Sequence, residues 1–369
     1  MADTTNKSED RPDMTGDTDI SAQLRERVRA AAEAGTALRI VGGDTKAFYG
    51  EPCQGEELAV GGHRGIVHYE PTELVITARA GTPLTQIEAT LGKAGQMLAF
   101  EPPHFGDTAT LGGTVAAGLS GPRRPYAGAV RDFVLGTQVL TGKAEVLGFG
   151  GEVMKNVAGY DVSRLMAGAL GTLGVLLEVS LKVLPRPVDE VTVVREEEDA
   201  AAVLTRLNRW AAQPFPITAS CYDGDRLYLR LSGTPRSVAD ARARLGGEVL
   251  AEGADFWHRL REQELTFFDG PAPLWRLSVS PTTPPMELPG KWLLDWGGAQ
   301  RWLKSDAEAQ TIRAAVARFG GHATLFRASA KNAPVFHPLP EGLAHIHRQL
   351  KRAFDPSGVL NPGRLYPDM

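Results

Sequence analysis

The chain has 369 residues, of which 43% are hydrophobic and 23% are charged, and its formal net charge is -4. This length predicts two domains, and a weakly negative chain lacks the basic surface that nucleic-acid binding requires. No apolar run is long enough to span a membrane, and the polar, acidic N-terminus does not resemble a signal peptide. The two cysteines, Cys53 and Cys221, form neither a zinc pair nor an iron–sulfur ligand set, so we expect a reduced, cytoplasmic protein.

The N-terminal half predicts helices and strands joined by long glycine-rich connections. Residues 1–19 are polar and rich in Asp, Thr and Lys, which is typical of a disordered tail. Ser21 is the candidate N-cap of a helix that ends before Gly35. The next expected elements are strands at 38–41, 66–70 and 73–81, a helix between Pro83 and Gly95, a hairpin over 132–150 with its tip at Thr141-Gly142, and a strand over 174–185. Apolar and polar residues alternate in the last strand, which predicts burial on one face.

Pro185-Arg186-Pro187 marks the expected domain boundary, because the sequence pattern changes after it. Residues 188–251 predict a ferredoxin-like βαββαβ unit, and a looser second copy runs from about residue 274 to 328. A helix near 342–354 leads into a turn-rich terminus. The sequence thus predicts an α+β protein with a first domain at 20–187, an antiparallel-sheet domain at 188–330 with helices on one face, and a C-terminal segment at 331–369.

The glycine pair Gly42-Gly43 directly follows the first expected strand. Backbone N–H groups of such a turn can converge on an anion, and glycine permits the positive φ that this requires. Asp44 and Thr45 continue the turn, and Lys46 could add a positive charge. The alternative is an ordinary tight turn, since the chain contains no Walker loop and no GxGxxG motif.

The stretch 110–122, TLGGTVAAGLSGP, carries no charge and almost no bulk. It contains too much glycine to predict a stable helix, and its side chains are too small for a good core. A backbone without large side chains can approach the face of a flat polar ring closely. A glycine-rich surface loop is the alternative, although such loops usually carry charges. The stretch does not contain the GxSxG nucleophile motif, which argues against a hydrolase.

A third segment, 155–183, contains Tyr160, Asp161 and Arg164 and ends in the alternating strand. Between them, Gly168, Gly171 and Gly174 are spaced by three residues. Glycines placed in this way before a strand again indicate a backbone that passes close to a ligand.

Together these segments resemble the FAD-binding domains of the vanillyl-alcohol oxidase and p-cresol methylhydroxylase type, and within it the FAD-binding subunits of bacterial glycolate oxidase. The resemblance covers the chain from about Ile20 onward and implies non-covalently bound FAD. It implies a two-part FAD-binding domain, a cap domain, and a C-terminal FDPSGVLNPGR segment that returns to the FAD-binding domain. The candidate cofactor-binding residues are Gly42, Gly43, Asp44, Thr45, Lys46, Leu111, Gly112, Gly113, Thr114, Ser120, Gly121, Tyr160, Gly171, Thr172, Gly174, Val175 and Asn361.

The sequence departs from the catalytic relatives of this family in the cap. Those relatives carry HxGDGNxH and EHG segments that supply a base and metal ligands, whereas this chain has only GGHATLF with His322, and RASAKNAP. His322, Arg327 and Lys331 are the remaining substrate-side candidates. His345 and His347 lie two apart on a predicted helix and make a poor metal pair, so we expect no metal site. His104 is a theoretical site of flavin attachment, with a loop histidine as the alternative.

The resemblance implies an FAD-binding redox subunit of a complex that oxidises glycolate to glyoxylate, with a degenerate substrate pocket of its own. The implied partners are a larger flavin subunit, which could bind the 2-hydroxy acid, and an iron–sulfur subunit. The complex would lie in the cytoplasm or at the inner face of the membrane, which this chain would touch only through its partners. Two alternatives remain open: a self-sufficient FAD-dependent 2-hydroxy acid dehydrogenase, and a structural subunit without flavin.

Overall fold

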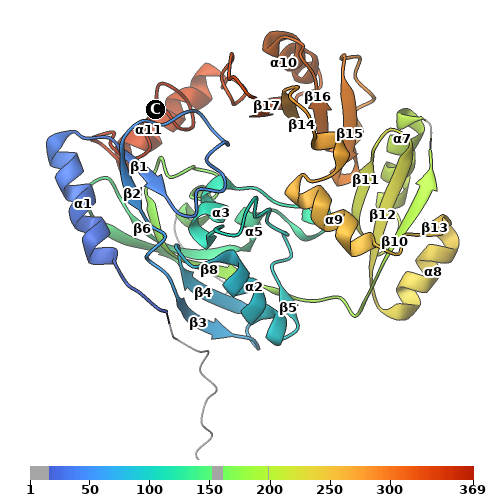
Figure 1. The fold of residues 1–369 in the computed structure, drawn as a ribbon, viewed down its shortest axis with the longest axis horizontal. Helices are drawn as coiled ribbons and strands as arrows, with labels where there is room; N and C mark the ends of the chain where they lie inside the picture. The colour runs from blue at the N-terminus through green and yellow to red at the C-terminus, as the bar shows by residue number, and fades with distance from the viewer. Residues whose placement is uncertain (1–15, 152–160, 198) are drawn as a thin grey trace, which may run out of the picture.

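The computed structural model describes residues 16–151, 161–197 and 199–369. An N-terminal domain and a cap domain lie side by side, and the C-terminal segment lies over the N-terminal domain (Figure 1). This arrangement confirms the predicted α+β class, with an antiparallel cap and a terminus that returns to the first domain. None of the helices in the described ranges is long and apolar enough to cross a membrane.

The first part of the N-terminal domain is a helix beside a parallel strand pair. Its elements are α1 (Ser21–Ala34), β1 (Leu38–Val41) and β2 (Glu56–Ala59). The prediction of Ser21 as N-cap is wrong, because Ile20 precedes the helix and the Asp19 carboxylate accepts the Ser21 N–H at 2.9 Å. Thr18 already exchanges backbone hydrogen bonds with Arg64 at 2.9 and 3.0 Å, so regular pairing begins just before the expected end of the tail.

The second part is a five-stranded antiparallel sheet in the order β3-β4-β8-β6-β7, with helices packed on it. The strands are β3 (Ile66–Glu70), β4 (Val75–Arg79), β6 (Val134–Leu140), β7 (Val146–Gly150) and β8 (Val175–Lys182), and a short pair is formed by β5 (Gln96–Met97) and β9 (Leu184–Pro185). The helices are α2 (Leu84–Lys93), α3 (Leu111–Ala117), α4 (Arg124–Ala127), α5 (Val130–Phe133) and α6 (Val162–Leu165).

The prediction that β8 is buried on one face only is wrong. β8 lies between β4 and β6, and both Leu176 and Ser180 are less than a tenth exposed. The Ser180 hydroxyl pairs with the Thr77 hydroxyl at 2.8 Å. A polar residue can therefore occupy the buried face because a neighbouring strand supplies its hydrogen bond.

The glycine-rich stretch forms the helix α3, although its composition predicted no stable helix. The Thr110 hydroxyl accepts a hydrogen bond from Gly113 N at 3.3 Å, and Gly118, with φ 67°, ends the helix. Leu111 and Val115 are fully buried in the domain core. Capping and tertiary packing therefore outweigh the low intrinsic helix propensity of glycine here.

The cap domain is one eight-stranded antiparallel sheet in the order β13-β10-β12-β11-β15-β16-β14-β17. Its strands are β10 (Asp189–Glu196), β11 (Ile217–Tyr222), β12 (Arg226–Gly233), β13 (Glu248–Val249), β14 (Leu274–Ser278), β15 (Lys291–Asp295), β16 (Gln300–Lys304) and β17 (His322–Arg327). Its helices are α7 (Ala200–Ala211), α8 (Pro235–Leu245), α9 (Gly253–Glu262) and α10 (Ala309–Ala317), with 3-10 turns η1 (Thr266–Phe268) and η2 (Trp296–Gly298).

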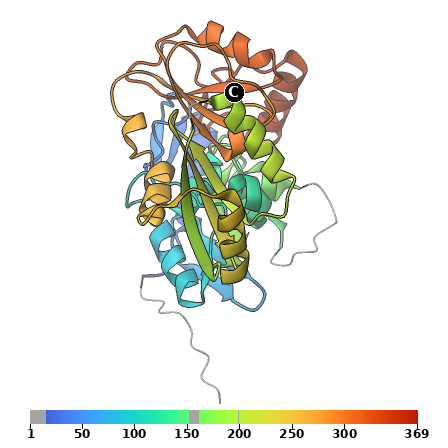
Figure 2. The same cartoon turned by 90° about the vertical axis from the view of Figure 1, so that its right-hand side faces the viewer.

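The two halves of the cap sheet repeat one strand order. In each half the fourth, first, third and second strands of the unit lie side by side, and β11 pairs with β15 where the halves meet. The second copy lacks the first helix, since residues 279–290 connect β14 to β15 without one. Helices α7, α8 and α10 cover the outer face, onto which Figure 2 looks, and the inner face lies against the N-terminal domain.

The C-terminal segment carries α11 (Glu341–Phe354) and joins the N-terminal domain beyond it. Leu38 N donates to Val359 O at 2.7 Å, and Leu360 forms a parallel bridge with Leu38. Lys351 pairs with Asp355 at 2.7 Å, and its ammonium group also donates to Thr172 O at 2.9 Å. The segment thus holds both β1 and the loop that precedes β8.

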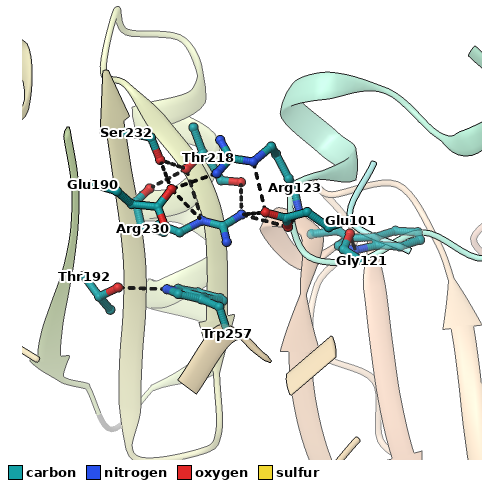
Figure 3. A network of polar contacts seen from close by, with 10 residues as sticks. Glu101, Gly121, Arg123, Glu190, Thr192, Thr218, Arg230, Ser232 and Trp257 are labelled. Carbon is teal, nitrogen blue, oxygen red and sulfur yellow. Dashed lines mark hydrogen bonds and ion pairs between the residues drawn. The ribbon is translucent and has the colours of Figure 1, made fainter. Parts of the chain in front are cut away.

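A four-charge network, defined by Glu101, Arg123, Glu190 and Arg230, joins the two domains (Figure 3). Glu101 of the N-terminal domain contacts Arg123 at 3.0 Å and Arg230 of the cap at 2.8 Å. Glu190 of the cap contacts Arg123 at 2.8 Å. Burial by itself would raise the pKa of Glu101, but the two guanidinium groups hold that pKa below its usual value. The network therefore fixes the cap against the N-terminal domain.

Candidate functional site

A cavity with about 930 Å³ of empty space opens between β1, α3 and the loop before β8. We name it the cofactor cavity. It is lined by Ile40, Val41, Gly42, Gly43, Asp44, Thr45, Lys46, Ala47, Val60, Ala80, Thr110, Gly112, Gly113, Ala116, Ala117, Met166, Ala169, Leu170, Gly171, Gly174, Val175, Leu176, Asn361 and Arg364. Glycine and alanine supply 11 of these 24 residues, so a ligand can approach the main chain closely there.

The turn after β1 forms the first wall, and the structure brings together all five residues predicted there, from Gly42 to Lys46. The positive φ falls on Asp44, at 57°, and not on either glycine. Glycine is needed for space instead: a Cβ at Gly43 would lie 1.5 Å from Thr108 O, and one at Gly42 would lie 2.6 Å from the Thr110 hydroxyl.

Lys46 brings a positive charge to this wall. Its ammonium group donates to His104 O at 3.1 Å and to the Thr45 hydroxyl at 3.3 Å. Burial lowers the pKa of Lys46 to about 8, although the nearby Glu262 carboxylate acts in the opposite direction. A bound anion would favour the charged form of this lysine, as the phosphates of a dinucleotide do.

Helix α3 forms the second wall, and its two glycines have different reasons for being small. A Cβ at Gly112 would lie 2.7 Å from Ala80 Cβ, so Gly112 is required by packing. A Cβ at Gly113 would meet only the Thr110 hydroxyl, at 3.2 Å, and Gly113 lines the cavity. Leu111 and Thr114 lie buried behind the wall, outside the lining.

The loop before β8 forms the third wall through Gly171, Gly174 and Val175. Thr172 does not line the cavity, because its hydroxyl turns back to Ala169 O at 2.7 Å. Gly174 has no room for a side chain, since a Cβ there would lie 2.4 Å from Val139. Tyr160, also predicted as a cofactor residue, lies outside the described residues.

Asn361 closes the cavity and connects two walls. Its amide oxygen accepts the Ile40 N–H at 2.7 Å, and its amide nitrogen donates to Leu170 O at 2.7 Å. Arg364 donates to the carbonyls of Ala47, Tyr49 and Glu51 at 2.7–2.8 Å. These two side chains therefore shape the cavity by holding the backbone on both sides of it.

Sequence reasoning missed several lining residues that lie next to predicted ones. Ala116 and Ala117 belong to the quoted small-residue stretch, Met166 and Leu170 to the third segment, and Arg364 to the NPGR motif. Their positions within these motifs were the signal that could have identified them from the sequence. Val60 and Ala80 come from elsewhere in the sequence, and only the fold brings them to the cavity.

Two of the three substrate-side candidates, Arg327 and Lys331, contact the same residue, Phe48, and none of the three lines the cofactor cavity. His322 is exposed at the start of β17. Arg327 stacks 3.6 Å from the Phe48 ring, and Lys331 donates to Phe48 O at 2.9 Å. His104 lies 3.2 Å from the Glu88 carboxylate and does not line the cofactor cavity. No group of three or more His, Cys, Asp or Glu side chains that could hold a metal ion occurs among the described residues.

A second, smaller cavity lies between the N-terminal domain and the inner face of the cap, with about 360 Å³ of empty space. We name it the interdomain pocket. It is lined by Pro103, Phe105, Leu119, Ser120, Gly121, Pro122, Leu260, Arg261, Gln263, Arg276, Asp295, Gln300, Trp302 and Phe326. Ser120 and Gly121, predicted to border the cofactor, line this pocket and not the cofactor cavity.

Comparison with known proteins relates this architecture to flavoproteins. Residues 19–150 match the FAD binding domain family. The chain is 52% identical over 356 residues to glycolate oxidase subunit GlcE of Escherichia coli (strain K12), which covers 96% of this chain and 100% of that protein. It is 32% identical over 161 residues to glycolate oxidase subunit GlcD of Bacillus subtilis (strain 168), which covers 43% of this chain and 34% of that protein.

Solved structures show the same fold at low sequence identity. p-Cresol methylhydroxylase with substrate bound superposes with a TM-score of 0.68 at 15% identity, covering 95% of this chain and 88% of that chain. Alkyldihydroxyacetonephosphate synthase superposes with a TM-score of 0.64 at 15% identity, covering 92% of this chain and 75% of that chain. These likenesses confirm the predicted p-cresol methylhydroxylase type of fold.

The cofactor cavity fits FAD on physical grounds. Glycines line its walls at three separate segments, and the half-buried Lys46 lies beside the turn that would face the phosphates. The predicted cofactor is thus confirmed as FAD. The chain belongs to the glycolate oxidase subunit GlcE family of FAD-binding oxidoreductases.

Proposed function

We propose that this chain is the FAD-binding subunit of a multi-subunit glycolate oxidase, which oxidises glycolate to glyoxylate and passes the electrons to a partner subunit. The observation that carries the proposal is the backbone-lined cofactor cavity in a chain that aligns with GlcE along its whole length. Bound FAD supplies the acceptor for the two electrons that leave the substrate.

The chain's own residues prepare the site for that chemistry. The turn from Gly42 to Lys46 binds the phosphates through backbone N–H groups and the lysine ammonium. Gly113 leaves open the space on α3 that a flat ring would occupy, while Asn361 holds the opposing backbone in place. The cap packs against the end of α3, where Ala117 and Leu119 share a buried apolar cluster with Trp257 and Phe326 of the cap.

Electron transfer would continue outside this chain. Its two cysteines are fewer than the four thiolates that an iron–sulfur cluster uses, so a separate iron–sulfur subunit would take the electrons. A larger flavin subunit would complete the complex. We place the assembly in the cytoplasm, at the inner face of the membrane, where this subunit meets lipid only through its partners.

Replacement of the Escherichia coli GlcE subunit tests the proposal. A strain that lacks its own GlcE should regain glycolate-dependent dye reduction when it expresses this chain, and the purified chain should be yellow and release FAD. Purified protein without flavin would favour the structural alternative. Turnover of glycolate by the isolated chain with an artificial acceptor would favour the self-sufficient dehydrogenase.

A further inference from the structure

The loop between β5 and α3 connects the cofactor turn to the cap, and we name residues 101–108 the bridging loop. Its Thr108 hydroxyl donates to Gly43 O at 2.6 Å, and the two backbones approach so closely that a Cβ at Gly43 would lie 1.5 Å from Thr108 O. Its His104 O accepts a hydrogen bond from the Lys46 ammonium group at 3.1 Å. The position of this loop therefore determines where the lysine and the glycine turn lie.

The backbone of the bridging loop is strained at two residues that are not glycine. Glu101 has φ 47° and Phe105 has φ 54°, which places both in the left-handed region. This conformation is unfavourable for a large side chain, so contacts with the surroundings must maintain it. The four-charge network holds Glu101, as described above. Phe105 and its neighbour His104 need a second support.

Glu262, the last residue of α9 in the cap, supplies this second support. Its carboxylate accepts the Phe105 N–H at 2.8 Å, the His104 N–H at 3.0 Å and the Arg261 Nε–H at 2.7 Å. The side chain is only 7% exposed. Burial by itself would raise the pKa of Glu262, but Arg261 and the two backbone N–H groups hold that pKa below its usual value. An ionised carboxylate in this position is a strong acceptor.

The same carboxylate acts on the charge of Lys46. Burial lowers the pKa of Lys46 to about 8, and the Glu262 carboxylate opposes that shift. The other charged groups nearby are engaged elsewhere. Asp44 lies 3.7 Å from Arg39, and Arg364 directs its guanidinium group to backbone carbonyls of the turn, including Lys46 O at 3.5 Å. Glu262 therefore favours the charged form of the lysine as well as the position of its acceptor.

We propose that Glu262 is a positioning residue for cofactor binding, which holds the bridging loop so that His104 O directs the Lys46 ammonium group toward the phosphates of FAD. The inference rests on the proposed role of the turn from Gly42 to Lys46 in binding those phosphates. None of the described residues that line the cofactor cavity belongs to the cap. The affinity for FAD nevertheless depends on the cap, because Glu262 acts through the bridging loop.

Titration of the full-length chain, freed of flavin, with FAD at pH 7 tests this inference. Glu262→Ala removes the acceptor for two N–H groups of the bridging loop and should weaken FAD binding by about tenfold or more. Glu262→Gln keeps one oxygen that can accept both N–H groups and should stay within about threefold of the natural chain. Glu264→Ala is the matched control, because it removes an exposed carboxylate two residues away. Melting temperatures without FAD check the folding of each variant.

A double-mutant cycle with Lys46 separates positioning from a general structural role. Lys46→Met removes the ammonium group and should by itself weaken FAD binding by about tenfold or more. In the Lys46→Met background, Glu262→Ala should change the affinity by about twofold or less, since the group that it positions is gone. A residue that only stabilises the fold would weaken FAD binding by the same factor in both backgrounds.

The pH profile of FAD affinity gives a readout that loss of folding would not reproduce. Because phosphates favour the charged lysine, the affinity of the natural chain should be full below the pKa of Lys46, about 8, and should fall as the pH rises through it. Glu262→Gln removes the carboxylate that opposes the effect of burial, so its fall should begin at a lower pH. Lys46→Met should show no such fall.

The outcomes distinguish this inference from the proposed function. A natural chain that binds no FAD contradicts both. Full FAD affinity in Lys46→Met contradicts the phosphate-binding role of the turn and, with it, the inference, but leaves FAD binding intact. Equal losses from Glu262→Ala in both backgrounds overturn the positioning role alone. If Glu262→Ala does not fold, the pH profile of Glu262→Gln decides, and a profile identical to that of the natural chain overturns the inference.

Discussion

Glycine and alanine supply 11 of the 24 residues that line the cofactor cavity, whereas the interdomain pocket combines apolar and aromatic side chains with polar groups that include Arg276, Asp295 and Gln300. In the cavity, Gly43 and Gly112 allow segments to approach until a single added carbon would collide. In the pocket, Gln263, Arg276 and Asp295 come from three different elements of the cap, the end of α9 and the strands β14 and β15. The comparison shows that shape defines one site and charge defines the other, so different substitutions should damage each.

The largest loss of stability is expected when the four-charge network that joins the two domains is broken. Glu101→Gln would leave Arg123 and Arg230 buried with only Glu190 as a partner, and we expect a loss of about 3 kcal/mol in the free energy of unfolding. Urea unfolding at pH 7 measures it. Glu196→Gln, which removes an exposed pair, is the control and should cost at most about 1 kcal/mol. Similar losses in both variants would contradict a structural role for the network.

A substitution that adds side-chain volume without adding charge should damage the cofactor cavity. Gly113→Leu should lower the stability of the chain without flavin by about 1–3 kcal/mol and should abolish the rise in melting temperature that saturating FAD causes. Gly148→Leu is the control, because a Cβ at this exposed glycine of β7 would meet nothing within 4 Å. An unchanged FAD-dependent shift in Gly113→Leu would show that α3 does not face the cofactor.

The stability of the chain should depend on pH through Asp295, which lines the interdomain pocket. The folded chain keeps the Asp295 proton up to a pKa of about 7, whereas an unfolded aspartate loses it near its ordinary value of 3.8. The folded state thus binds more protons in this interval, and stability from this group falls as pH rises through it. Glu101 and Arg230 act on the same carboxyl in opposite directions.

Asp295→Asn should therefore be more stable than the natural chain at pH 8, by more than about 1 kcal/mol, and its advantage should be clearly smaller at pH 5, where less of the interval above 3.8 has been crossed. Melting temperatures of both proteins at the two pH values provide the measurement. A stability difference that does not vary with pH would mean that Asp295 is ionised throughout this range.

The smallest effect concerns the cap of α3. Thr110→Ala removes the hydroxyl that accepts the Gly113 N–H and should cost about 1 kcal/mol, with weaker FAD binding as a consequence. Thr110→Ser keeps that hydroxyl and should retain most of the stability in thermal unfolding. If the alanine and serine variants melt together, packing alone maintains the helix.

Eleven of the 24 residues that line the cofactor cavity were predicted from the sequence, because they lie in contiguous motifs. The turn at 42–46, the glycines of α3, Asn361, and Gly171, Gly174 and Val175 of the loop before β8 all line it, and each lies in a segment with an unusual local composition. The helical state of α3 was not predictable from that composition, because its stability comes from the Thr110 cap and the burial of Leu111. The sequence also did not show which glycines are required by packing and which leave room for a ligand.

The sequence by itself determined the two-domain α+β organisation, the ferredoxin-like units of the cap and the flavin-binding segments, since these depend on local periodicity and on small residues in runs. Only the tertiary structure decided how the two halves of the cap join through β11 and β15, and how the four-charge network fastens the cap. It also decided that Gln263, Arg276 and Asp295 meet in one pocket. Each of these side chains is unremarkable in its own segment, and its chemistry arises from burial and from neighbours that strand pairing brings from elsewhere in the chain.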